Sequence, residues 1–493
     1  MKRIAYCSPI NPQPSGISDY SEELLPYLGQ YAEVVLFVTR GVEPSNSRLQ
    51  QHLEVRPLDQ LPRMHVAQPF DALVYHMGNS PAHAEIYEHA LNLPGVVVLH
   101  DYVLHHFRLW HAAAHRDDVD RYRREMAARY GVRGAAVAER MARGQLLDAA
   151  FEMPLVEDLV ESARGVIGHS RLIVERVRGL HPGVAVARVP MGVPLPPLEE
   201  RAAARLALGL PLDTPVWASF GHINPYKRME PVLRAFRYFR RLYPSARYVL
   251  VGSVSPSYDL QGLIRRLGLE RAVTVTGFVA PEAWSRYVAA SDLCLNLRYP
   301  TAGETSASVL RLLGAARPVL VSAIDALDEL PDDVCAKVDP GPAEVDQILH
   351  YALVLHKWPR IARELGRSAR DFVAREHSLV GAARGYAQFL GQLYGWGQLQ
   401  PLRPPLWEVD PPTQPPLPVV EGEYGHHAPG QPTSARHALE AGLGVVDLAH
   451  ETGAALAELG VTADDDAILR DTAGTIADLL GARPAQGRWW RRR

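Results

Sequence analysis

Short apolar runs recur in two series along the chain, and each run is followed by turn residues and a helical stretch. The first series comprises residues 4–7, 34–38, 72–75, 96–99 and 166–168, and the second comprises 216–220, 248–251, 273–275, 293–297 and 319–321. Such runs are typical of buried strands in βαβ units, which build parallel sheets. The sequence therefore predicts an α/β protein with two Rossmann-like domains facing a central cleft, where ligands bind at the carboxyl ends of strands.

The composition excludes several classes of protein. The 493 residues are 47% hydrophobic and 22% charged, which is the balance of an ordinary globular protein of about two to four domains. A net charge of −3 argues against a nucleic-acid partner. Cys7, Cys294 and Cys335 are too few and too scattered for a disulfide framework or a zinc site. With no apolar run of about 18 residues and a strand-like start instead of a signal peptide, we expect a cytoplasmic protein.

Three segments lie outside the two series. Residues 102–164 are rich in Arg and Ala and predict a long helical insertion, which either covers the first sheet or forms one wall of the cleft. Residues 401–432 contain ten prolines and predict a linker, because proline cannot donate the N–H group that helices and sheets need. Residues 433–482 then predict a small helical extension. The basic and aromatic tail, 483–493, either touches acidic lipid head groups at the inner membrane face or keeps the chain soluble.

The segment 298–319 carries the most informative polar residues. Glu304 precedes a small-residue helix that we expect to begin at Thr305 and Ser306. The free N–H groups and short hydroxyls of such a first turn suit a diphosphate. Arg298, at the end of the preceding strand, adds a cation beside the same turn.

A second cationic segment follows the strand at 216–220. His222, Lys227 and Arg228 stand before the helix predicted at 231–243, whose apolar stripe faces the core. Cations at a helix start add to the positive end of the helix dipole and favour an anion. Lys227 is therefore a candidate clamp for a diphosphate, although surface lysines are also common.

Two strand ends of the first series carry further candidates. Gly16 lies in the first strand-to-helix turn, where it lets a bulky ligand approach the backbone, and Ser18 or Asp19 can cap the next helix. A plain proline-rich turn is the alternative. His100 and Asp101 follow the strand at 96–99, where His100 is either a structural residue or a hydrogen-bonding site residue. The nearby His105, His106 and His111 match no zinc signature.

These motifs together resemble the GT-B glycosyltransferases of the large retaining class called family 4, or glycosyl transferases group 1, over about residues 1–397. In that family a Gly-Arg-x4-Lys-Gly loop neutralises the nucleotide diphosphate; Lys227 matches its lysine, and His222 stands in place of its arginine. The family also carries Glu-x7-Glu before a Gly-x-Pro-Val turn. Here Arg311 occupies the second position and Glu304 lies one place after the first. The other matching elements are the segments 15–17, 165–170 and 189–193, and His100 in its strand-end His-Asp pair.

The resemblance implies a metal-independent hexosyltransferase, of the kind used in polysaccharide biosynthesis. It would move a sugar with retention from a UDP- or GDP-linked donor to a glycan, lipid-linked or small-molecule acceptor, without a further cofactor. The residues expected to act are His100, Lys227 and Glu304 in catalysis; Gly16, His222, Arg228, Arg298, Thr305, Ser306 and Arg311 on the donor; and Ser15, Asp19 and Asp101 on the acceptor side.

The same resemblance divides the chain into an acceptor-side domain, 1–195, a nucleotide-sugar domain, 196–378, and a helix, 379–400, that crosses back to the first domain. Two alternatives remain open. A GT-B epimerase would use the same sugar nucleotide differently. In a non-catalytic interaction module, the unusual His222 and Arg311 would mark the loss of donor binding, because guanidinium cannot accept the hydrogen bonds of a ribose.

Overall fold

The first apolar series forms a parallel sheet of seven strands in the computed structural model, which describes residues 1–13, 15–145 and 147–409. The strand order is β3-β2-β1-β4-β5-β6-β7. The strands are β1 (Arg3–Cys7), β2 (Glu33–Val38), β3 (Glu54–Pro57), β4 (Ala72–Met77), β5 (Val96–Leu99), β6 (Gly165–Gly168) and β7 (Ala185–Arg188).

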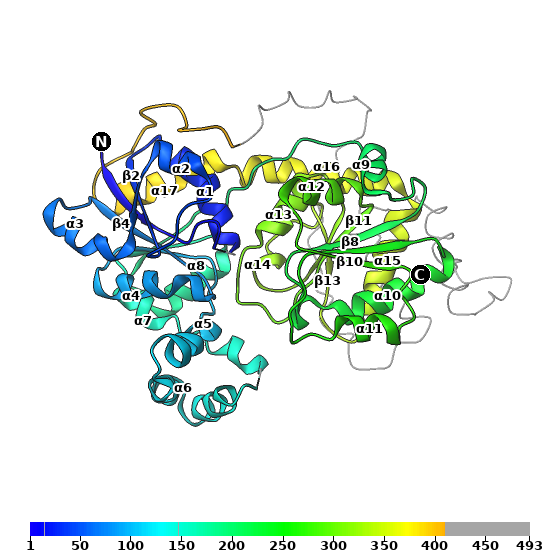
Figure 1. Ribbon diagram of the computed structural model, residues 1–493, viewed down its shortest axis with the longest axis horizontal. Coiled ribbons are helices and arrows are strands. Elements are labelled where there is room, and N and C mark those ends of the chain that lie inside the picture. Colours follow the sequence, from blue (N-terminus) through cyan, green and yellow to red (C-terminus); the bar gives the residue numbers. More distant parts are fainter. Residues whose placement is uncertain (14, 146, 410–493) are drawn as a thin grey trace, which may run out of the picture.

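The second series forms a parallel sheet of six strands in the order β10-β9-β8-β11-β12-β13. Its strands are β8 (Val216–Phe220), β9 (Arg247–Val251), β10 (Val273–Gly277), β11 (Leu293–Asn296), β12 (Val319–Ser322) and β13 (Ala336–Val338). Both orders reverse direction beside the first strand of the sheet, which is the doubly wound pattern. The predicted α/β class with two Rossmann-like domains is confirmed, and the two sheets lie side by side along the long axis of the molecule (Figure 1).

Helices cover both faces of each sheet, because each central strand is buried on both sides. In the first domain they are α1 (Gly16–Leu28), α2 (Ser47–His52), η1 (Leu58–Gln60), α3 (Leu61–Ala67), η2 (Pro81–His83), α4 (Ala84–Asn92), α5 (His105–Trp110), the π-helix η3 (His111–His115), α6 (Val119–Ala142), η4 (Asp148–Glu152), α7 (Glu157–Ser162) and α8 (Arg171–Leu180). In the second they are α9 (Arg201–Leu208), η5 (Pro225–Lys227), α10 (Met229–Leu242), α11 (Leu260–Arg266), α12 (Pro281–Ala290), α13 (Ala307–Gly314), α14 (Asp325–Asp328), α15 (Glu344–Lys357) and α16 (Pro359–Glu376).

One apolar core runs through both domains. It joins α1 and one face of the first sheet to α13, α16 and one face of the second sheet. Helix α17 (Leu379–Leu393) belongs to this core, and Tyr386 on it accepts a hydrogen bond from Tyr20 of α1 at 3.2 Å. The chain thus returns to the first domain after completing the second, as the yellow helix in Figure 1 shows.

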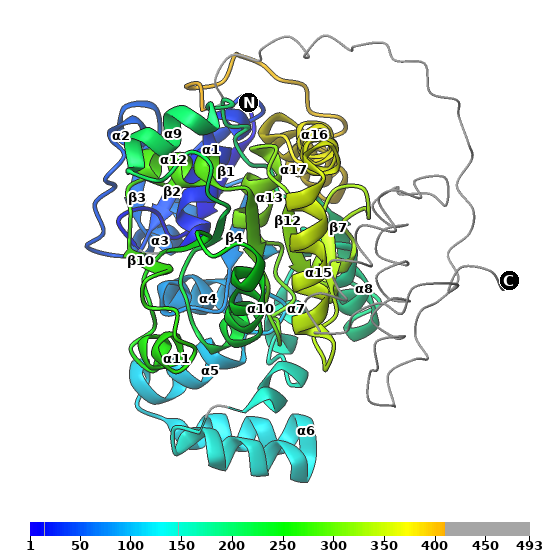
Figure 2. The same ribbon diagram turned by 90° about the vertical axis from the view of Figure 1, so that its right-hand side faces the viewer.

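The insertion at 102–164 differs from the long helical segment that we predicted. It is broken into α5, η3, α6, η4 and α7, and α6 itself changes direction at Gly131, which has φ +61°. Helix α6 does not cover the sheet: it projects beyond the edge of the first domain in both views (Figures 1 and 2). Its apolar residues, including Tyr122 and Met126, pack into a small separate core with Ala112 and Met153. Gly131 allows the turn that closes this core.

The segment predicted as a linker begins with nine residues packed on the first domain. The Leu402 and Leu406 N–H groups donate to carbonyls of Gln30 and Pro26, and Trp407 lies against the His52 ring. The rest of that linker, the helical extension and the basic tail fall outside the described residues. Within the described ranges, none of the helices is long and apolar enough to cross a membrane.

Candidate functional site

The two points where the strand order reverses face each other across the domains. In the second sheet this point lies between β8 and β11, so the loops after these strands, 221–228 and 297–306, meet there. In the first sheet the corresponding loops follow β1 and β4, and the loop after β5 adds His100 and Asp101. Ligands of doubly wound folds bind at these positions. The topology therefore gathers most of the predicted site residues where the two domains meet.

Arg298 and Glu304 form the charged centre of the second-domain side. The Arg298 guanidinium is paired with the Glu304 carboxylate and also donates to Asn296 Oδ1 at 2.6 Å and to Ser306 Oγ at 2.8 Å. Its Nε is buried without a partner among the described residues. Glu304 Oε2 accepts from the Ala302 N–H group at 2.9 Å, which fixes the carboxylate beside the loop.

Lys227 lies close to this pair and is partly buried. The pKa of Lys227 is lowered to about 7, mainly by burial and then by the positive charge of Arg298, while Glu304 opposes the shift. Its ammonium group forms no ion pair with the described part of the chain. An anionic ligand that enters here would favour the charged form of Lys227, because its negative charge replaces the hydration that the ammonium group loses on burial.

The turn before α13 differs in detail from the predicted cradle. The helix begins at Ala307, two residues later than predicted, because Ser306 is its N-cap and accepts from the Val309 N–H group at 3.4 Å. Ser306 is thus partly committed to the cap and to Arg298. Thr305 Oγ1, by contrast, is buried and has no hydrogen-bond partner among the described residues. An unpartnered buried hydroxyl is costly, and a ligand oxygen could satisfy it.

Asp101 approaches the same centre from the first domain. Backbone contacts join the two sides, since the Tyr102 and Val103 N–H groups donate to the Ala302 carbonyl at 2.8 and 2.9 Å. Burial raises the pKa of Asp101, and the nearby Glu304 carboxylate raises it further. Asp101 Oδ2 accepts from the Asn79 N–H group at 2.7 Å. A carboxyl group from each domain therefore lies close enough to the other to interact electrostatically, with Arg298 nearby.

His100 lies deeper, with 4% of its surface exposed. Its Nε2 lies 2.9 Å from His76 Nδ1, and its ring packs against Tyr20 and His169 at centroid distances of 5.2 and 4.8 Å. Burial lowers the pKa of His100 well below its usual value, so the imidazole is neutral near pH 7. His100 Nδ1 is buried and has no hydrogen-bond partner in the described residues.

The first strand-to-helix turn is capped by Ser15. Helix α1 begins at Gly16, and Ser15 Oγ accepts from the Ile17 N–H group at 3.2 Å, so neither Ser18 nor Asp19 is the cap. Asp19 instead accepts from Asn11 Nδ2 at 2.9 Å. A Cβ atom at Gly16 would have no neighbour within 4 Å, so the backbone there is open to a ligand.

Three candidates on the donor side have protein partners. Arg228 is paired with Glu344, a carboxylate with 2% of its surface exposed. His222 is exposed, and its Nδ1 lies 2.9 Å from Ser253 Oγ. Arg311 pairs with Glu23 of α1 at 2.5 Å, so the residue at the second family position bridges the two domains.

Sequence reasoning missed two residues that shape the site. Asn79 holds Asp101 through its N–H group, and its Oδ1 accepts from the Phe107 N–H group at 2.8 Å, which ties the β4 loop to α5. Glu23 was missed as well. Asn79 follows a predicted strand and could have been flagged by position, but Glu23 lies within a helix and its partner is 288 residues away.

The second domain carries the sequence similarity to a known protein family. Residues 200–311 match the family model described as glycosyl transferases group 1. A D-inositol 3-phosphate glycosyltransferase of Mycobacterium leprae is 30% identical over 189 residues, which are 37% of this chain and 40% of the relative. An alpha-D-kanosaminyltransferase of Streptomyces kanamyceticus is 25% identical over 183 residues, 37% of this chain and 46% of that protein. The chain thus spans less than half the length of these relatives.

Solved structures resemble the whole two-domain body. A sucrose-phosphate synthase from Thermosynechococcus elongatus superposes with a TM-score of 0.59 at 17% identity, covering 80% of this chain and 100% of that one. Anabaena HepE, determined in complex with UDP and glucose, gives 0.57 at 15% identity with the same coverage. At such identities the likeness concerns the fold. The family match covers part of the second domain, residues 200–311, and the two facing Rossmann-like sheets have the GT-B fold of these solved structures.

Proposed function

We propose that this chain is a retaining glycosyltransferase that moves a hexose-type sugar from a nucleotide diphosphate to a glycan, lipid-linked or small-molecule acceptor. One observation carries the proposal: Lys227, Arg298, Glu304 and Asp101, drawn from both domains, interact electrostatically where the two domains meet. The matched relatives include a D-inositol 3-phosphate glycosyltransferase, and HepE binds UDP and UDP-glucose, which supports a nucleotide-sugar donor.

The chemical demand in such a reaction is the charge that develops on the departing diphosphate. Preorganised cations stabilise it best in a cleft from which water is partly excluded. Lys227 becomes protonated when the diphosphate binds, and Arg298 Nε lacks a partner in the described chain, so each has capacity for a phosphate oxygen. Thr305 Oγ1 can donate a further hydrogen bond. These groups would supply the charge stabilisation that the metal-independent mechanism requires.

Retention is explained by attack on the same face from which the diphosphate leaves. The acceptor hydroxyl oxygen forms the new bond to the anomeric carbon as the bond to the diphosphate oxygen breaks, and the hydroxyl proton passes to that departing oxygen. His100 Nδ1 and Glu304 would hold the donor sugar. Asp101, whose pKa is raised, would hold the acceptor hydroxyl opposite them.

A donor screen tests the proposal directly. The purified chain is titrated with UDP and GDP by calorimetry and then incubated with UDP-, GDP- and ADP-sugars, while nucleotide release and transfer to simple glycoside acceptors are followed. We expect one nucleotide to bind and its sugar to be transferred, with a retained anomer by NMR. An inverted product would refute the same-face mechanism. Lys2→Met serves as the control for the Lys227 variants. Lys2 precedes the amino end of β1, away from the carboxyl ends of the strands, and pairs with Asp71.

The contacts of Arg311 and His222 favour one alternative. Arg311 is paired with Glu23 and His222 Nδ1 lies 2.9 Å from Ser253 Oγ, so both residues that depart from the family pattern have protein partners, as in a non-catalytic module. The same titration separates the two functions, because a module that has lost its donor site binds neither UDP nor GDP.

A further inference from the structure

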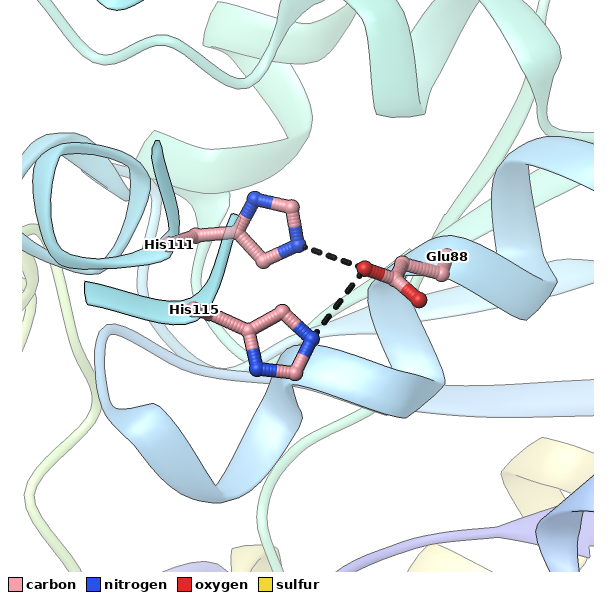
Figure 3. A group of neighbouring side chains, drawn as sticks. All are labelled: Glu88, His111 and His115. Atoms are coloured by element: carbon pink, nitrogen blue, oxygen red, sulfur yellow. Dashed lines mark hydrogen bonds and ion pairs between the residues drawn. The ribbon is translucent and has the colours of Figure 1, made fainter. Parts of the chain in front are cut away.

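A second group of polar residues gathers on the first domain, outside the cleft residues described above. Glu88 lies on α4, and His111 and His115 lie on the π-helix η3. Figure 3 shows both imidazole rings pointing at one carboxylate oxygen from the facing element. Glu88 Oε1 is 2.9 Å from His111 Nε2 and 3.3 Å from His115 Nε2. One ligand atom from each residue fits within 4.8 Å of the others.

The backbone between the two histidines is unusual. The Arg116 N–H group donates to the His111 carbonyl at 2.9 Å, five residues back, which is the hydrogen bond of a π-helix. π-turns are rare and are found frequently at functional sites. Here the turn stacks the two imidazole rings at a centroid distance of 5.1 Å and an interplanar angle of 29°, so both Nε2 atoms face the same side.

Two imidazole nitrogens and one carboxylate oxygen are a ligand set that zinc uses in proteins. With metal–ligand distances of about 2.0–2.2 Å, ligand atoms around a tetrahedral ion stand about 3.3 Å apart. The two nitrogen–oxygen separations already approach that spacing. We propose that Glu88, His111 and His115 bind a divalent transition-metal ion of the zinc type, with the fourth position open to water.

Arg116 is the competitor for this site. Its guanidinium is paired with the same Glu88 oxygen, so an ion that binds there must displace it. The side chain of Arg116 is 52% exposed and can move into solvent, whereas His111 is 7% exposed and fixed. The arginine therefore lowers the affinity for a cation by charge repulsion and by occupying the oxygen. Substitutions of the neighbouring residues His115 and Arg116 should therefore change the metal affinity in opposite directions.

The experiment is a metal titration of the full chain after treatment with a chelator. Zn²⁺ binding is followed by calorimetry, and Co²⁺ binding by the visible absorption of tetrahedral cobalt. We expect His115→Ala to weaken binding at least about 100-fold, since it removes a ligand. Arg116→Ala should tighten binding. A cluster held only by hydrogen bonds predicts no metal dependence and a loss of stability in both variants.

His89→Ala is the matched control. His89 lies on the same helix as Glu88, and its Nδ1 lies 2.8 Å from the Glu85 carbonyl of its own helix, outside the cluster. Because the chain has 20 histidines, the comparison between variants decides the result, and stoichiometry alone does not. His115 is partly exposed, so its alanine variant should keep the fold, which circular dichroism of the metal-free proteins checks. Equal Co²⁺ affinity in wild type and His115→Ala, or weaker binding in Arg116→Ala, overturns the proposal.

Discussion

The ionisation of Lys227 makes a quantitative prediction for nucleotide binding. In the ligand-free protein its pKa is lowered to about 7, mainly by burial, and a bound diphosphate favours the charged form. Binding therefore takes up a proton above pH 7. The affinity contributed by the charged lysine is fully present below pH 7 and is lost as the pH rises through that value.

The size of the effect follows from the fraction of charged lysine. That fraction falls from about one half at pH 7 to about 1% at pH 9, so nucleotide affinity should weaken roughly 50-fold, or about 2.3 kcal/mol. Lys227→Arg keeps its charge at both values and should show no such loss. Lys227→Met should bind weakly with a flat profile, and Lys227→Ala should lose at least about 100-fold in turnover.

Calorimetric titration with UDP or GDP between pH 6 and 9 measures this dependence, after the donor screen has selected the base. The nucleotide's own phosphate also titrates, so the ratio of wild-type to Lys227→Arg affinities isolates the lysine. A ratio that stays constant across this range would refute the assignment of Lys227 to the diphosphate. Lys2→Met should follow the wild type throughout.

Three other substitutions probe the cleft. Glu304→Gln should lower turnover at least about 100-fold. It should leave the affinity for UDP or GDP no weaker, because a negative charge is removed beside the diphosphate, and weaker nucleotide binding would contradict this. Arg311→Gln should lower the free energy of unfolding, measured in urea, by about 1–3 kcal/mol. A double-mutant cycle with Glu23→Gln should show coupling between the two residues, whereas strict additivity would argue against the ion pair. Gly78→Ala should lower turnover with nucleotide affinity unchanged, because its Cβ would stand 2.4 Å from Ile17 Cδ1 and 3.0 Å from Asp101 Oδ2 and so displace the first-domain loops. Gly179→Ala, with no neighbour within 4 Å, is its control, and equal turnover in both would exclude the effect.

The strands show how much of the fold could be predicted from local sequence. Ten of them were predicted from apolar runs, because central parallel strands are buried on both faces. The edge strands β3, β7 and β13 were missed. The first two have largely exposed or half-buried residues, and β13 has only three residues, so none produces an apolar run.

The candidate site shows the same division. Lys227, Arg298 and Glu304 were predicted because strand ends of a doubly wound sheet meet at one edge, and that relation follows from the order of the strands. The start of α13 was misplaced by two residues, since Ser306 serves the cap only once Arg298 and Val309 are in place. Caps of this kind depend on side-chain contacts as well as on residue type.

The sequence by itself determined the fold class and the resemblance to group 1 glycosyltransferases, because burial periodicity and motif spacing are local properties of the chain. Only the tertiary structure decided which charges meet. The lowered pKa of Lys227, the Glu23–Arg311 bridge and the convergence of Glu88 on His111 and His115 each depend on residues from separate elements. Electrostatic energies depend on distance and burial, and both are set only when the elements pack together.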